Sequence, residues 1–133
     1  MFLRALNNIE KELVLGLAIH AVNADKKIEE KEKMCLELYA DELGINLSDA
    51  SKLSVIDICK QLKEKSDEKQ INKIVFEIAA LMLVDFEYDE NEKEFMNTLI
   101  DELGVSSSKL EKMIDYIREY MNVVNKINVL LEK

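Results

Sequence analysis

The chain has 133 residues and a net charge of -9; 48% of its residues are apolar, 34% are charged, and proline is absent. One hydrophobic core is expected at this length, and the lack of proline, with only three glycines, excludes a fold built on β-hairpins. Because binding to phosphates needs clustered Lys and Arg, the acidic charge argues against nucleic acid as a partner.

Apolar residues at helical spacing predict three blocks in the first half of a single all-α domain spanning residues 1–133. Asn8 is placed to cap the first block, and Gly44 suits the left-handed position after the second. The third block is one helix or two short ones, with Leu53, Ile56 and Cys59 on a shared face. The predicted blocks cover residues 9–23, 29–43 and 48–65.

Three more helices are predicted after a polar segment at residues 63–70, which gives six to seven helices in all. Asp67 and Gln70 form a capping-box pattern before the first, whose apolar run predicts the most buried helix. Ser108 with Glu111 forms the same pattern before the last. These helices cover residues 68–84, 90–103 and 109 to about 131.

The last helix carries an apolar stripe that approximates a heptad, so its end can extend beyond the domain. The stripe consists of Leu110, Met113, Ile117, Met121, Val124, Ile127 and Leu131.

An internal repeat relates the two halves at an offset of sixty residues. The acidic turn after the first helix recurs after the fourth, and residues 41–44, Asp-Glu-Leu-Gly, recur at 101–104. The repeat predicts two helical units, at about 9–62 and 67–131, packed about a pseudo-twofold axis. The identical pairs in the turns are Asp25 and Asp85, Glu30 and Glu90, Glu32 and Glu92, and Lys33 and Lys93.

The repeated turn resembles a motif of the tellurite-resistance TerB-like family. Residues 24–32 read Ala-Asp-x-x-Ile-x-x-x-Glu, and residues 84–92 repeat the pattern with Val, Asp, Tyr and Glu. The resemblance covers residues 13–117 and implies a helical domain with an acidic metal site, linked to tellurite and other stress responses. Glycine usually follows the aspartate in that family, whereas Lys26 and Phe86 stand here.

A similar domain occurs at the N-terminus of some DnaJ-type membrane cochaperones, which implies an interaction role. Because the sequence contains no J-domain motif, we do not expect the chain to be the cochaperone itself.

The acidic turns allow two interpretations. In one, carboxylates from both turns converge on a divalent cation, with Ca²⁺ or Mg²⁺ favoured, or the second turn binds it alone. In the other, the carboxylates only cap helices, as the pairing of Asp89 with Glu92 indicates. An EF-hand is excluded because its glycine and glutamate positions hold Glu90 and Met96. The candidate metal ligands are Asp25, Glu32, Asp85, Glu87, Asp89 and Glu92.

Residues for catalysis are scarce, so we expect no enzymatic activity. His20 is the sole histidine and lies in an apolar helix, where a hydrogen-bonded structural role is expected. Cys35 and Cys59 lack the spacing of a redox or zinc pair and are expected to be reduced and buried.

A protein partner, or a second copy of the chain, is the expected ligand of the last helix. Tyr116, Tyr120 and Met121 are the candidate contact residues, and any association with a membrane is expected only through a partner. The N-terminus lacks the apolar core of a signal peptide, and the longest apolar run covers about half a membrane span. We therefore expect a cytoplasmic protein.

Overall fold

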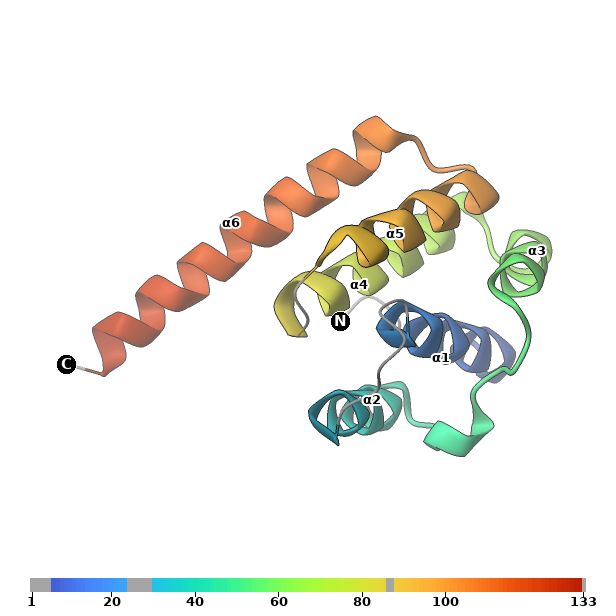
Figure 1. Cartoon of the computed structure of the whole chain (residues 1–133), viewed down its shortest axis with the longest axis horizontal. Helices are drawn as coiled ribbons and strands as arrows, with labels where there is room; N and C mark the ends of the chain where they lie inside the picture. The colour runs from blue at the N-terminus through green and yellow to red at the C-terminus, as the bar shows by residue number, and fades with distance from the viewer. Residues whose placement is uncertain (1–5, 24–29, 86–87, 133) are drawn as a thin grey trace.

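The structure is a computed structural model, and it describes residues 6–23, 30–85 and 88–132. Within these ranges the chain forms helices and no strand, which confirms the all-α prediction (Figure 1). The elements are α1 (Asn8–Val22), α2 (Glu30–Leu43), the short 3-10 helix η2 (Leu47–Asp49), α3 (Val55–Lys65), α4 (Glu68–Asp85), α5 (Glu90–Leu103) and α6 (Ser107–Leu131).

Helices α1 and α4 form the centre of the core. Helix α1 packs against α2, α3 and α4, while α4 also packs against α5 and α6. Nine of the fifteen residues of α1 are buried, whereas seven are buried among residues 68–84. Helix α1, rather than the predicted α4, is therefore the most buried helix, because its apolar residues surround it on all sides.

Gly16 lets the segment after η2 lie directly on α1. A Cβ atom at this position would stand 2.8 Å from the backbone oxygen of Ser51 and 3.0 Å from Ile58. The Ser51 amide donates to the carbonyl of Glu12 at 2.9 Å, which fixes this close approach. A glycine is thus needed here for space.

A buried polar link joins the start of α1 to the end of α3. Asn7 and Glu10 form a capping box, and the Ser66 hydroxyl donates to the second carboxylate oxygen of Glu10 at 2.5 Å. The predicted cap at Asn8 is one residue late, because the residue three positions after Asn8 is Lys11, which cannot accept from the cap backbone.

Two serine-capped helices begin differently from the predictions. The third block is split into η2 and α3, whose cap is Ser54. Leu53 and Ile56 are exposed, so the predicted shared face is wrong; the buried residues of α3 are Ile58, Cys59 and Leu62. Helix α6 is capped by Ser106, not Ser108, because it starts directly after the turn at 104–105.

The two Asp-Glu-Leu-Gly stretches end their helices in the same way. Gly44 has a φ of 78°, which confirms its predicted left-handed C′ position, and Gly104 has nearly the same φ of 75°. The following residues, Ile45 and Val105, donate to the carbonyls five positions back at 3.1 and 2.9 Å. This is the Schellman pattern, in which an apolar residue after the glycine returns to the core.

Under the sixty-residue offset, α1 corresponds to α4 and α2 to α5. Helix α1 contacts α2 and α3, as α4 contacts α5 and α6. These matching neighbours fit the predicted repeat, while the pseudo-twofold axis stays a prediction.

The second half of α6 projects from the helical body. Its first half packs on α4 and α5, and its C-terminal end extends away from the other helices in Figure 1. Every residue from 122 to 132 is exposed. None of the helices that the structure describes combines the length and apolar character needed to cross a bilayer.

Candidate functional site

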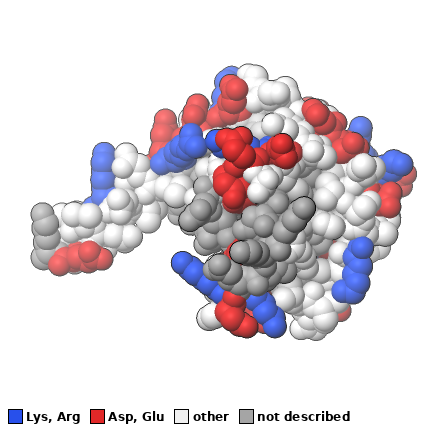
Figure 2. Space-filling model, in the orientation of Figure 1, with Lys and Arg blue, Asp and Glu red and all other residues white. Residues whose placement is uncertain are grey.

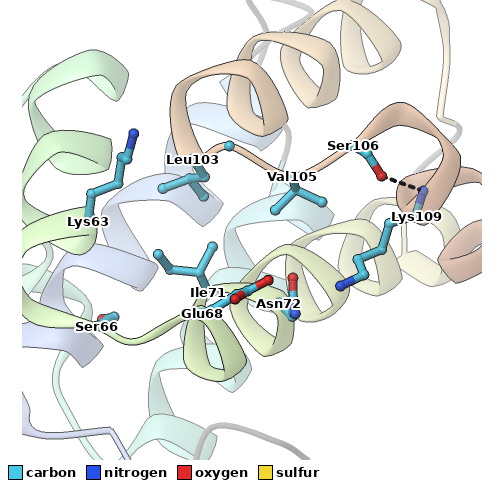
Figure 3. Close-up of a pocket in the computed structure, with 10 residues that line it drawn as sticks. Lys63, Ser66, Glu68, Ile71, Asn72, Leu103, Val105, Ser106 and Lys109 are labelled. Atoms are coloured by element: carbon cyan, nitrogen blue, oxygen red, sulfur yellow. Dashed lines mark hydrogen bonds between the residues drawn. The ribbon is translucent and has the colours of Figure 1, made fainter.

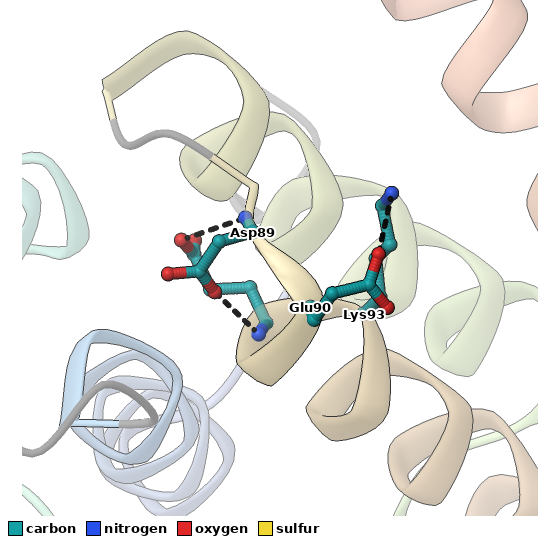
Figure 4. A network of polar contacts seen from close by, with 4 residues as sticks. Asp89, Glu90 and Lys93 are labelled. Carbon is teal, nitrogen blue, oxygen red and sulfur yellow. Dashed lines mark hydrogen bonds and ion pairs between the residues drawn. The ribbon is translucent and has the colours of Figure 1, made fainter.

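The described part of the second acidic turn is a helix start. Asp89 is the N-cap of α5, and its carboxylate accepts from the Glu92 amide at 3.1 Å. Glu92 accepts from the Asp89 amide at 3.3 Å and is buried. Glu90 pairs with Lys93 at 3.4 Å on the exposed side of the same turn (Figure 4). Asp89 and Glu92 thus occupy the capping positions that their spacing predicts.

The remaining predicted ligands lie at the margins of the described structure. Asp25 and Glu87 are outside the described residues, and Asp85 ends α4 with a side chain that is likewise not described. Glu32 lies in the first turn of α2 and is half-buried. Over residues 6–23, 30–85 and 88–132, no group of three or more acidic, histidine or cysteine side chains could hold a metal ion.

Tyr88, just before the cap, has an unusual backbone. Its φ of 48° lies in the left-handed region, which residues other than glycine rarely adopt. The side chain packs against the core. Burial raises the pKa of the Tyr88 hydroxyl above its ordinary value, although the neighbouring Arg118 lowers it and Glu92 raises it further. The residue anchors the entry to α5 on the core.

The histidine and the two cysteines, which are the side chains most often used in catalysis, have positions that fit structural roles. His20 Nε2 lies 2.9 Å from the Leu53 carbonyl oxygen, which is the predicted hydrogen-bonded role. Cys59 is fully buried, and burial, followed by the charge of Glu102, raises the pKa of its thiol to about 11. Cys35 was expected to be buried, but its side chain is only half-buried.

Tyr39 is the second tyrosine held in the core. Burial, with smaller effects of Glu77 and Glu42, raises the pKa of its hydroxyl above the ordinary range. Its hydroxyl oxygen is buried without a hydrogen-bond partner in the part of the chain that the structure describes.

Among the described residues, two open hollows lie between helices. The first, about 430 Å³, lies between the α3–α4 junction and the α5–α6 turn (Figure 3). Lys63 and Lys109 stand on opposite sides of it, with Glu68 also on its wall, and the Ser106 hydroxyl caps the Lys109 amide at 3.1 Å. The second, about 400 Å³, lies between α5 and α6. Neither hollow has a histidine or cysteine among its described lining residues.

Helix α6 carries two apolar stripes on different faces. The body-facing stripe includes Leu110 and Ile117, which are buried, and Met113 and Met121, which are half-buried against the core. Met121, a predicted contact residue, therefore lies mainly on the side that packs against the body.

The second stripe is exposed along its whole length and is here called the docking stripe. Its members follow one another at spacings of four, three, four and three residues, which is the period of a coiled-coil seam. Their exposed fractions run from 48% to 73%. The docking stripe consists of Tyr116, Tyr120, Val123, Ile127 and Leu130.

The docking stripe is centred about 100° around the helix from Ile117, at 100° per residue. The sequence prediction included Tyr116 and Tyr120 but missed Val123 and Leu130, because it followed the single stripe through Ile117. The alternating spacing of four and three residues from Tyr116 to Leu130 was the available signal. The surface of the projecting end in Figure 2 is largely free of charged side chains.

Comparisons with protein-family models, curated proteins and solved structures found no significant match to this chain. The TerB-like resemblance therefore stays a prediction from the repeated motif.

Proposed function

We propose that this protein is a non-enzymatic helical docking module that binds the apolar face of a helix on a partner protein. The docking stripe of α6 carries the proposal: five apolar side chains, each 48% exposed or more, follow coiled-coil spacing on one face. Contiguous exposed apolar side chains on a soluble domain mark interaction sites. A link to stress responses, as the TerB-like motif implies, fits such a module.

The projecting end of α6, which carries three of the five residues of the docking stripe, supports the same proposal. Residues 122–132 are all exposed, yet they continue the helix to Leu131. Isolated helices shorter than about 12 to 15 residues are marginal in water, because they lack tertiary packing. A partner that covers the docking stripe would supply the missing packing.

The divalent-cation proposal has less support. Asp89 and Glu92, two of its candidate ligands, are already engaged in a capping box. Helix capping accounts for their position without an ion.

Site-directed photo-cross-linking tests the proposal. Benzoylphenylalanine is placed at Tyr120, within the docking stripe, or at Asn125, which is exposed on the opposite side of α6. We expect irradiation of cells that produce the chain to give a discrete adduct from position 120 and none from position 125. The mass of the adduct identifies the partner as a second copy or another protein. No discrete adduct from position 120, or the same adduct from both positions, would contradict the proposal.

A further inference from the structure

The docking stripe has features of a self-complementary surface. Its 3.5-residue period is the one that a second α-helix matches when the two coil around each other. Tyr116, Tyr120 and Val123 lie on one face with Ile127 and Leu130, so a copy of the same helix running in the opposite direction presents the same kinds of side chain. Helix α6 and its C-cap, residues 107–132, contain four acidic and four basic residues, in a chain whose net charge is -9. A second copy of this acidic chain is therefore repelled less by α6 than by the rest of the surface.

We infer that the docking stripe binds the α6 helix of a second copy in an antiparallel, twofold-symmetric pair, an inference that rests on the proposed docking function. In this pair Tyr120 faces Val123 of the partner subunit, and Tyr116 faces Ile127 of the partner subunit. The symmetry repeats each contact, as in any isologous interface.

Two charged residues beside the stripe select this register. Glu119 and Lys126 lie seven residues apart on the flank of α6 that faces away from the body, and both are exposed. In the proposed register, Glu119 lies beside Lys126 of the partner subunit, and the pair occurs twice. A shift of one heptad in either direction places Lys126 beside its own copy, or Glu119 beside its own copy, and like charges repel.

A parallel pair has no such charge match. Side chains that flank the seam of a parallel coiled coil meet those five residues further along the partner helix, so Glu119 would meet Val124 and Lys126 would meet Leu131. Glu119 and Lys126 therefore pair with opposite charges only in the antiparallel arrangement.

The antiparallel register also agrees with the shape of the molecule. Its twofold axis passes between Met121 and Asn122, which is where α6 leaves the body. The projecting end of each copy then lies along the body-packed half of the other, where it covers Tyr116 and Tyr120. Val124 and Leu131, exposed on the flank between the two stripes, face the body of the partner subunit.

Sedimentation equilibrium of the purified full chain, with two matched variants, tests the inference. Val123 and Val129 are 53% and 50% exposed on the same helix, but Val129 lies on the face opposite the stripe. We expect the parent chain and Val129→Glu to dimerise at about 10–100 μM, within the range of affinities seen for small interfaces. Val123→Glu should remain monomeric, because it places a carboxylate in the seam.

Charge reversal then tests the register. Glu119→Lys and Lys126→Glu should each weaken the dimer about tenfold, because two attractive pairs become repulsive. The double variant should restore the parent affinity. Equal weakening by Val129→Glu, no effect of the single reversals, or no recovery in the double variant would overturn the inference.

A parent chain that is monomeric at about 100 μM would also overturn self-pairing. The docking function would then still stand if the Tyr120 cross-link yields an adduct with another protein. Both would fail if that cross-link yields no discrete adduct.

Discussion

Individual residues set the closest contacts of this fold, and Gly16 is the clearest case. It allows a loop to touch the most buried helix, so its neighbours on the loop, Ser51 and Leu53, can bond to Glu12 and His20. The sequence shows a glycine inside an apolar run but not the loop that lies on it. That contact joins positions more than thirty residues apart, beyond the reach of local periodicity.

Gly16→Ala should destabilise the fold by about 1–3 kcal/mol, the usual range for overpacking. The added methyl group meets a backbone oxygen at 2.8 Å, which cannot rotate away. Urea denaturation measures the change. The sign of the change in the free energy of unfolding shows whether the loop obstructs this position, because alanine in an unobstructed helix interior stabilises by about 1 kcal/mol relative to glycine. A more stable variant would show that the loop can withdraw from α1.

The buried thiol of Cys59 should make the stability of the fold depend on pH in the alkaline range. Its pKa is raised from an ordinary 9.0 to about 11 by burial, so between these values the folded chain holds a proton that the unfolded chain releases. The contribution is fully present below about pH 9 and is lost as the pH rises toward 11. We expect the free energy of unfolding to fall by about 1–3 kcal/mol over this interval.

Denaturant titrations of the parent and of Cys59→Ala, at about pH 8 and pH 10.5, measure this effect. The variant should show a smaller fall, because the remaining loss comes from other groups such as Tyr39, whose pKa is also raised. An equal fall in the free energy of unfolding of the two proteins would show that the Cys59 thiol ionises as readily in the folded chain as in the unfolded chain.

At the scale of elements, the sequence predicts the end of a helix well where only one nearby residue can act as its cap. The predicted bounds of α5 are those observed, because Asp89 and Gly104 are unambiguous caps. The start of α6 was misplaced because three serines follow one another at 106–108, and only the preceding turn selects Ser106. The face of α3 was misassigned because Leu53 precedes the helix rather than lying in it.

Substitutions of Asp89, at the start of α5, distinguish a helix cap from a metal ligand. Asn is as good an N-cap as Asp, whereas Ala costs about 0.5–2 kcal/mol. If Asp89 acts only as a cap, Asp89→Asn should keep nearly the parent stability, and Asp89→Ala should lose about 1 kcal/mol. Neither loss should depend on added Ca²⁺ or Mg²⁺. Thermal unfolding in EDTA and in about millimolar ion measures this; an ion-dependent midpoint that Asp89→Asn abolishes would instead establish a cation site.

At the scale of the whole molecule, the chain divides into a helical body and a projecting helix end. Helices α1 to α5 and the first half of α6 share one core, and the apolar pattern of the sequence predicts this. The exposure of the docking stripe could not be predicted in the same way, because a heptad pattern alone does not show which of two adjacent faces packs on the body. The structure assigns Ile117 to the body and leaves Tyr120 exposed.

Amide hydrogen exchange across residues 122–131 tests most directly whether the docking stripe is covered by a partner helix. At low concentration these amides should exchange rapidly, because short helices without tertiary packing open readily. At high concentration the parent and Val129→Glu should become protected, whereas Val123→Glu should not. Rapid exchange at every concentration would contradict pairing with a second copy. Equal protection in all three proteins would show that the helix end is stable alone, which would contradict its need for a partner.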